Sequence, residues 1–419
     1  MACERQWSRA RVVLFAGLLL IAVIVAFVTV IAAASVTSRP LRFLTTGWVV
    51  SALGVCAAVR LVVPLNQRTR IGVATLTILS IAGGFGLLWR GHWSMPSPPP
   101  DTRWIDLPSG SHLAYMKLAA PAPTNLPPVI FLHGGPGIAD MRADAPYLRG
   151  LAAAGFDVFL YDQLGAGRST RLADPNGYTL ASAVADLDAV RQAIGAERVD
   201  LLGYSWGATL AAAYLAAHPN RVAKVVFISP GPMDGGASGL GGLFARLSAW
   251  RIAALLWHVL QPRPLLTWEM VQVNPRGAHD FAGDAEMDAR FRVINRIAAP
   301  ALYCHRPRHL TGGDPGFYAY AMLLRPAARR DFHRELHDLH TSALIVKGQC
   351  DYLSWSSAVD YRDTLLDAKL VYLPQCGHQL FVECPEAFTR VVAKFLDGQP
   401  LSFPFVAGSA PPKGYNGPP

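Results

Sequence analysis

The chain has 419 residues, of which 52% are hydrophobic and 16% charged, and a formal net charge of +9 at pH 7. This length exceeds the usual size of one domain, so two or more parts are expected. The positive charge comes from scattered arginines without a dense basic run, which argues against nucleic acid as a partner.

The excess of hydrophobic residues is concentrated in the first 90 positions, which predict a transmembrane region over 1–94. A helix needs about 20 apolar residues to cross a bilayer core. The first uncharged run has 25 residues, longer than the roughly 7–15 of a signal peptide, which is the alternative interpretation. We expect three membrane helices, the second being the least certain, at about 12–36, 43–63 and 71–89.

Arginines flanking these runs predict the orientation, because cytoplasmic loops carry an excess of positive charge. Six lie on the side of the N-terminus and four on the other side. They are Arg5, Arg9, Arg11, Arg60, Arg68 and Arg70 against Arg39, Arg42, Arg90 and Arg103. The count favours a cytoplasmic N-terminus, a multi-pass protein of the cell membrane, and an extracytoplasmic position for everything after Trp89.

The part beyond the membrane region predicts an α/β fold, a doubly wound, mostly parallel sheet with an inserted helical cap. Short apolar strands alternate with helical patterns, and the alternation stops for roughly 110 residues after Pro230. The expected order is a Pro-rich linker, a first core part, the cap, a second core part and a disordered tail. Their ranges are 95–100, 101–230, 231–340, 341–400 and 401–419.

The segment G-Y-S-W-G at 203–207 stands where a predicted strand gives way to a predicted helix. In a nucleophile elbow, only glycines fit beside a serine at the apex of such a tight turn. Small residues also collect at ordinary turns, so this motif alone is weak. Ser205 is nevertheless the candidate nucleophile.

A serine hydroxyl needs a neighbouring base and an orienting carboxylate, which in this fold follow in the order Ser, Asp or Glu, His. Asp351 follows the predicted strand A-L-I-V-K-G, and His378 follows K-L-V-Y-L. Both stand at the carboxyl end of a strand, where sheets of this kind bind ligands. Asp234, after the preceding strand, is the rival for the acid.

The glycine-rich loop H-G-G-P-G at 133–137 also follows a predicted strand directly. Its backbone N–H groups can approach a substrate carbonyl closely, as an oxyanion hole requires. We expect the N–H groups of Gly135 and Trp206 to form this hole. A plain glycine turn is the alternative interpretation.

Together these motifs resemble the α/β-hydrolase fold and, within it, the proline iminopeptidase family of serine aminopeptidases. The resemblance covers about 127–237 and 343–395, and the pairing of H-G-G-P-G with S-W-G is fairly specific. It implies that Ser205, Asp351 and His378 form a catalytic triad. Catalysis through an acyl-serine intermediate needs neither a metal nor an organic cofactor.

Departures from the family concern the substrate. The family has an arginine where Leu164 stands, and its cap carries glutamates that bind the free α-amino group. Glu269, in T-W-E, resembles one of these glutamates, while the other has no counterpart here. Glu269 and Gly134 are therefore candidates for substrate binding, although Glu269 alone is also typical of a solvated helix residue.

Two further segments give hypotheses. The stretch 244–261 is apolar on one face and carries Arg and Trp, so it either packs as a cap helix or touches the membrane surface. Cys350 and Cys376 stand at the ends of two strands expected to be neighbours. A disulfide between them would brace the loops that carry the acid and the base.

The sequence thus predicts a membrane-anchored serine hydrolase whose partners are a lipid bilayer and a peptide or small acyl substrate. An aminopeptidase of proline iminopeptidase type is the first hypothesis. An esterase or amidase acting on small or lipophilic acyl substrates is the alternative. A non-catalytic hydrolase fold serving as a receptor is disfavoured by the complete set of site motifs.

Overall fold

A computed structural model describes residues 9–62, 66–86, 93–95, 97–98, 102–235, 239–305 and 312–419. Cys3, the end of the third predicted membrane helix at 87–89 and much of the predicted linker lie outside them. The chain divides into two compact units. The first comprises Met1–Trp93 and Leu260–Gly283, and the second comprises Ser94–Val259 and Asp284–Pro419.

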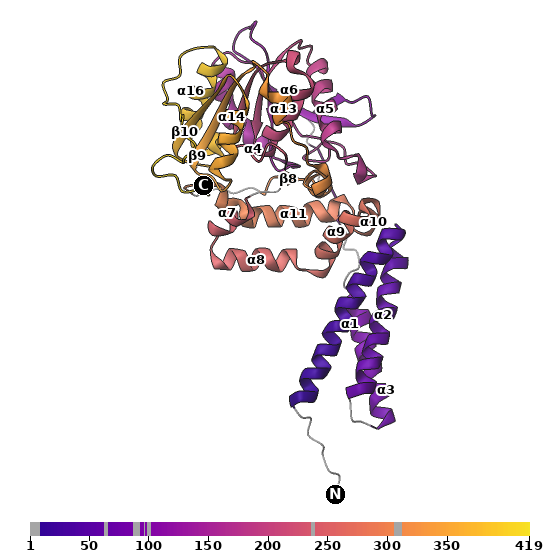
Figure 1. The fold of residues 1–419 in the computed structure, drawn as a ribbon. Helices are drawn as coiled ribbons and strands as arrows, with labels where there is room; N and C mark the ends of the chain where they lie inside the picture. Colours follow the sequence, from indigo (N-terminus) through magenta and orange to yellow (C-terminus); the bar gives the residue numbers. More distant parts are fainter. Residues whose placement is uncertain are drawn as a thin grey trace. The chain divides into compact units, whose positions relative to one another are not determined.

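The first unit contains three N-terminal helices (Figure 1), α1 (Arg9–Val36), α2 (Pro40–Val62) and α3 (Gln67–Gly86). Among the helices of the described segments, α1 and α2 are long and apolar enough to cross a membrane. Small residues let these two helices pack closely: a Cβ atom added at Gly47 would lie 2.2 Å from Val30 Cγ2, and one at Gly54 would lie 2.7 Å from Ala22 Cβ.

Two short helices from the middle of the chain, α9 (Pro262–Val273) and α10 (Pro275–Phe281), belong to the same unit. Asn274, between them, donates a hydrogen bond of 2.7 Å to the carbonyl of Ala34 near the end of α1. The ring of Phe281 packs edge-on against Phe43 of α2, with ring centroids 5.9 Å apart. Both rings are buried, so residues 260–283 are fixed to the turn between α1 and α2.

The second unit is built on an eight-stranded sheet with the order β1-β2-β5-β3-β6-β7-β9-β10. In this sheet β1–β2 and β2–β5 pair antiparallel and the other five pairs are parallel, which confirms the predicted mostly parallel sheet. The strands are β1 (Arg103–Asp106), β2 (His112–Leu118), β3 (Val129–Leu132), β5 (Val158–Tyr161), β6 (Val199–Tyr204), β7 (Val222–Ile228), β9 (Ser342–Cys350) and β10 (Ala368–Gly377). The short strands β4 (Ile138–Ala139) and β8 (Asp314–Pro315) pair separately.

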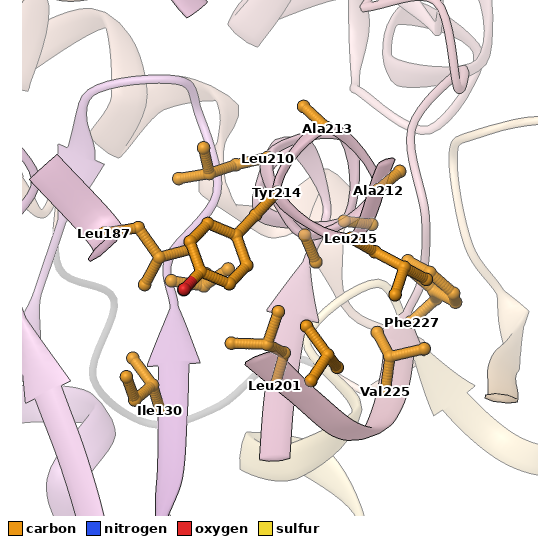
Figure 2. Packing of buried hydrophobic residues seen from close by; sticks show 14 of the residues in the cluster. Ile130, Leu187, Leu201, Leu210, Ala212, Ala213, Tyr214, Leu215, Val225 and Phe227 are labelled. Atoms are coloured by element: carbon orange, nitrogen blue, oxygen red, sulfur yellow. The ribbon is translucent and has the colours of Figure 1, made fainter. Parts of the chain in front are cut away.

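Successive apolar side chains of the central strands pack on opposite faces of the sheet, since side chains alternate along a strand. On one face, Leu201 and Ile130 pack with Tyr214 and Leu210 of the adjoining helix (Figure 2). On the other face Leu202 joins a second buried cluster. The flanking helices are α4 (Met141–Ala153), α5 (Leu180–Ala193), α6 (Trp206–Ala217), α14 (Trp355–Thr364), α15 (Leu380–Glu383) and α16 (Pro385–Leu396).

Helices fill the interval between β7 and β9, where the sequence predicts a cap. Those of the second unit are α7 (Leu240–Ala245), α8 (Ala249–Val259), α11 (Asp284–Ala298), α12 (Phe317–Leu323) and α13 (His333–His337). Part of the predicted cap, 260–283, belongs instead to the first unit. Its apolar residues pack on α1 and α2, a contact that no local pattern reveals.

Residues 401–419, for which the sequence predicts a disordered tail, make defined contacts with the hydrolase. Phe405 pairs with Val371 and covers part of the exposed edge of β10. Further on, Tyr415 packs against Trp355 with ring centroids 5.2 Å apart, and the N–H of Asn416 donates to the carbonyl of Gln349 at 2.8 Å. Aromatic anchors and backbone hydrogen bonds therefore order a segment whose Pro and Gly content alone indicates disorder.

The predicted disulfide between Cys350 and Cys376 is wrong. Cys350 bonds Cys304, and Cys376 bonds Cys384. In the register of β9 and β10, the residue opposite Cys350 is Gly377. The register of β10 shifts between Leu373 and Gly377, which puts Gly377 rather than Cys376 opposite Cys350.

Candidate active site

Ser205 lies at a sharp turn between β6 and α6. Its backbone has φ 55° and ψ −117°, a conformation that non-glycine residues rarely adopt and that is often found at functional sites. Hydrogen bonds hold the turn in place: the N–H of Ser205 donates to Ile228 at 2.9 Å, and its carbonyl accepts from Gly231 at 3.2 Å. The structure thus places Ser205 on the strand-to-helix turn that the sequence predicts.

The two glycines of G-Y-S-W-G are required by close backbone contacts. A Cβ atom added at Gly203 would lie 2.5 Å from the carbonyl oxygen of Gly207. One added at Gly207 would lie 2.2 Å from the carbonyl oxygen of Leu132, at the end of β3. Any side chain at either position would force the helix away from the sheet and open the turn.

His378 directly follows β10, and Asp351 directly follows β9. His378 Nδ1 and Asp351 Oδ1 are 2.7 Å apart, and both side chains are buried. The same carboxylate oxygen accepts a hydrogen bond of 3.0 Å from the N–H of Leu353. Asp351, and not its rival Asp234, is therefore the carboxylate that orients the imidazole.

The second oxygen of Asp351 faces a buried cation. Lys347 Nζ lies 2.8 Å from Asp351 Oδ2, and both side chains have 0% exposure. Burial opposes ionisation of Asp351, but the charges of Lys347 and His378 outweigh it and hold the pKa of the carboxyl below its usual value. Burial also lowers the pKa of Lys347, and Asp351 counteracts that effect.

Two tyrosines connect the imidazole to the serine. Tyr204 immediately precedes Ser205 in the chain, and its ring centroid lies 5.1 Å from that of His378. The ring of Tyr352 lies 4.5 Å from His378, and its hydroxyl is hydrogen-bonded to the Ser205 side chain. Ser205, His378 and Asp351 are thus gathered at the carboxyl edge of the sheet, with Tyr352 in contact with both reactive groups.

The glycine-rich loop lies against this turn. A Cβ atom added at Gly134 would lie 2.9 Å from Ser205 Cβ. Gly135 has φ 121°, and a Cβ atom there would lie 2.6 Å from the nitrogen of Ile138. Trp206 is the first residue of α6, where the backbone N–H has no partner within the helix and the helix dipole favours negative charge.

The ring of His133 is hydrogen-bonded to the backbone of the glycine-rich loop and to that of Gln163. Its Nε2 accepts a 3.0 Å hydrogen bond from the N–H of Gln163, so Nδ1 carries the proton and donates to Gly134 at 2.9 Å. Burial lowers the pKa of His133 to about 4, which keeps the ring neutral, although the hydrogen bond to Gly134 opposes the shift. The Gln163 side chain in turn donates to the carbonyl of His133 at 3.0 Å.

Lys347, Tyr352 and His133 are not identified by the sequence analysis as parts of the site. One signal for Lys347 is visible, a lysine within the apolar strand A-L-I-V-K-G. Glu269, the candidate for ammonium binding, lies half-buried on α9 in the first unit, and its predicted role stays a prediction. Within the described residues no group of three His, Cys, Asp or Glu side chains is placed to hold a metal ion.

Comparison with known proteins agrees with this fold. Residues 127–251 match the family model described as alpha/beta hydrolase fold. The chain also resembles the crystal structure of VinJ with a TM-score of 0.51 and 20% identity, over 72% of this chain and 100% of that chain. The chain is an α/β hydrolase of the serine hydrolase class.

Among curated proteins, the chain is similar to proline iminopeptidases. It is 28% identical over 289 residues to the enzyme of Heyndrickxia coagulans, and the matched region covers 64% of this chain and 90% of that protein. It is 26% identical over 324 residues to the enzyme of Lactobacillus delbrueckii subsp. bulgaricus, spanning 70% and 97%. These similarities support a hydrolase of aminopeptidase-like function.

Proposed function

We propose that this chain is a membrane-anchored aminopeptidase of proline iminopeptidase type in which Ser205 is the nucleophile, His378 the general base and Asp351 the orienting acid. The observation that carries the proposal is the hydrogen-bonded pair of His378 and Asp351 beside a serine held at φ 55°. A serine without a base is a weak nucleophile, and this arrangement supplies both the base and its orientation.

In the proposed reaction, Ser205 Oγ attacks the scissile carbonyl while His378 takes the hydroxyl proton. The backbone N–H groups of Gly135 and Trp206 donate to the oxyanion of the tetrahedral intermediate. The C–N bond then breaks as His378 returns the proton to the leaving amine, which leaves an acyl-serine. Water then attacks this ester while His378 takes a proton from it. The C–O bond to Ser205 breaks as His378 returns the proton to Ser205 Oγ, which releases the free N-terminal residue and regenerates the enzyme.

The substrate class is tested by blocking the α-amino group. We expect the full-length protein to hydrolyse a proline arylamide and to lose most of that activity on the N-acetylated analogue. An acyl group removes the ammonium charge, so any carboxylate that binds it, with Glu269 as the candidate, is left unpaired. The measurement is kcat/KM for both arylamides and for a simple aryl ester.

Glu269→Gln is the matched variant in this comparison, because it keeps the size of the side chain and removes its charge. If Glu269 binds the ammonium group, the variant loses activity on the free arylamide and keeps its activity on the ester. Equal or faster turnover of the acetylated analogue and the ester in the unchanged protein would support the esterase or amidase alternative and reject the aminopeptidase.

For the membrane region we propose three crossings with α3 as the third. Residues 260–283 leave the hydrolase sequence after Val259 and rejoin it at Asp284, so a bilayer does not separate them from it. Asn274 in this segment bonds Ala34, next to the turn between α1 and α2. If α2 crosses the membrane away from that turn, α3 has to cross back before the hydrolase begins.

We also propose that the hydrolase lies outside the cytoplasm, as the distribution of arginines favours. Two disulfides in the hydrolase support this side of the membrane, because disulfides persist in oxidising compartments. Peptide mapping without reduction, on protein isolated from membranes, is expected to recover Cys304 linked to Cys350 and Cys376 linked to Cys384. Recovery of all four as free thiols would instead place the hydrolase in the cytoplasm.

A further inference from the structure

The helix α8 has one face that packs into the second unit. Leu255 is buried, and Ile252 and Val259 are partly buried beside it. These residues contact α11, which runs alongside α8 (Figure 1). Arg251 Nη1 donates a 3.0 Å hydrogen bond to the carbonyl of Ile297 at the end of α11 and fixes the rotation of α8 about its own axis.

The opposite face of α8 is apolar and exposed. Trp250 has 79% of its surface exposed and Trp257 has 71%, and Leu260, directly after the helix, has 58%. Trp250, Ala253 and Trp257 recur at intervals of three and four, so they form one continuous stripe on the helix. Soluble surfaces rarely expose large apolar side chains in a contiguous row, which indicates that the stripe binds a partner.

The chemistry of the stripe matches the boundary between lipid head groups and acyl chains. Tryptophan is enriched at that boundary because its ring is apolar and its N–H is polar. Trp250 and Trp257 are seven residues apart on one face, so they reach the same depth when the helix lies parallel to the membrane surface. With 11 residues, α8 is too short to cross a bilayer core, so it can meet the membrane only along its exposed face.

Chain continuity links this stripe to the segment that packs on the membrane helices. Val259, the last residue of α8, is followed directly by the segment 260–283, whose Asn274 and Phe281 contact the end of α1 and the start of α2. If α1 and α2 span a bilayer, their turn emerges at its surface. The C-terminal end of α8 is then tethered close to that surface by a short length of chain.

From these observations we propose that the stripe formed by Trp250, Ala253 and Trp257 lies in the interface of the bilayer that α1 and α2 span. The proposal rests on the membrane anchoring put forward above and is independent of the peptidase activity. The partner is a lipid surface, and a second copy of the chain is the competing occupant. The hydrolase would thus contact the bilayer through α8, in addition to the contacts of residues 260–283 with α1 and α2.

Fluorescence quenching by brominated lipid tests this proposal. The full chain is placed in phosphatidylcholine nanodiscs with or without bromine near the carboxyl end of the acyl chains, and the quenched fraction of the tryptophan emission is measured. The chain has 10 tryptophans. Replacing quenched tryptophans by Phe lowers this fraction, whereas replacing unquenched ones raises it. The expected result for the Trp250→Phe, Trp257→Phe double variant is a lower fraction.

Two single variants make the result interpretable. Trp104→Phe is the matched control, because Trp104 is 41% exposed on the edge strand β1, and its removal is expected to raise the quenched fraction. Trp48→Phe reports on α2 itself and is expected to lower it. If Trp48→Phe does not lower the fraction, the membrane anchoring fails.

If Trp48→Phe lowers the fraction while the double variant raises it, α8 does not contact lipid and only the present inference is overturned. Quenching of the α8 tryptophans in nanodiscs with one chain, but not in those with two, would assign the stripe to a second copy and would also overturn it. The substitutions by Phe keep the size and apolar character of the ring, so folding is preserved in each comparison.

Discussion

Ser205→Ala is expected to lower kcat at least about 10³-fold and to leave KM nearly unchanged, because the proposed mechanism loses its nucleophile while the binding surfaces remain. The variant should fold, since alanine needs no more room at φ 55° than serine and the two glycines that shape the turn remain. Steady-state hydrolysis of an arylamide or aryl ester measures the loss. Labelling by a fluorophosphonate, which reacts with activated serines, should disappear with it.

Ser229→Ala is the matched control. Ser229 follows the neighbouring strand β7, has φ 45° and is buried. It shares the residue type, the backbone strain and the burial of Ser205 but has no assigned role in the reaction. If the control and the Ser205 variant lose activity to the same extent, the loss comes from the fold. If Ser205→Ala retains most of the wild-type kcat, the acyl-serine mechanism is wrong.

The sheet could be predicted from sequence because its strands are short, apolar and bounded by turn residues. β9 and β10 both begin within one residue of the predicted runs A-L-I-V-K-G and K-L-V-Y-L, since an apolar run ends where the backbone meets solvent. The positions of Ser205, Asp351 and His378 follow from the same reasoning. Parallel strands end at one edge of the sheet, so residues that directly follow them come together without knowledge of side-chain packing.

Features that depend on contacts between distant segments could not be predicted. The register of β10 shifts between Leu373 and Gly377, so the residue opposite Cys350 is Gly377 and not Cys376. The tail is ordered by Tyr415, which packs on Trp355 about sixty positions earlier in the chain. Local composition contains neither the register nor the packing, so neither the disulfide partners nor the contacts of the tail can be predicted from it.

The ion pair of Lys347 with Asp351 could not be predicted either, because it also depends on packing in the folded chain. Its partner Asp351 was identified for its position after β9, and nothing in the sequence shows that the second carboxylate oxygen faces a lysine. Alternation along the strand places residues 347 and 351 on one side, but a buried lysine is rare enough that a solvated side chain is the default expectation. The 0% exposure of both groups changes this interpretation.

Lys347→Met is the second prediction with a large effect. We expect the free energy of unfolding at pH 7 to fall by about 3–5 kcal/mol, because removing one partner of a buried ion pair leaves the other charge uncompensated. We also expect kcat to fall by about 10²-fold, since an unsupported Asp351 no longer fixes His378 in its productive position. Chemical denaturation measures the first effect, and kcat per fluorophosphonate-titrated site measures the second.

The pH dependence of Lys347→Met separates positioning from mere stability. In the unchanged protein Lys347 holds the pKa of Asp351 down, so the carboxylate remains ionised in mild acid. Without the cation, burial raises that pKa, Asp351 becomes protonated at a higher pH, and the acid limb of kcat/KM moves upward. The other groups facing Asp351 stay the same in both proteins. They are His378, Arg246, Tyr204, Tyr352 and Tyr415.

The stability difference has the opposite dependence on pH. A carboxyl group whose pKa is lower in the folded state stabilises the fold above its unfolded pKa of about 3.9, and this contribution is lost as the pH falls toward the folded value. The gap in unfolding free energy between wild type and Lys347→Met should therefore be full at neutral pH and shrink in acid. Over the same range the gap in activity should widen.

Lys224→Met provides the control for these two trends. Lys224 donates hydrogen bonds to the carbonyls of Phe395 and Leu396. It lies near the amino end of the neighbouring strand β7, whereas the triad residues follow the carboxyl ends of their strands. Its loss should lower stability without moving the acid limb. If Lys347→Met lowers stability but keeps the wild-type kcat per titrated site and the wild-type pH profile, the ion pair serves the fold alone. Asp351 would then orient His378 without help from the lysine, through the N–H of Leu353.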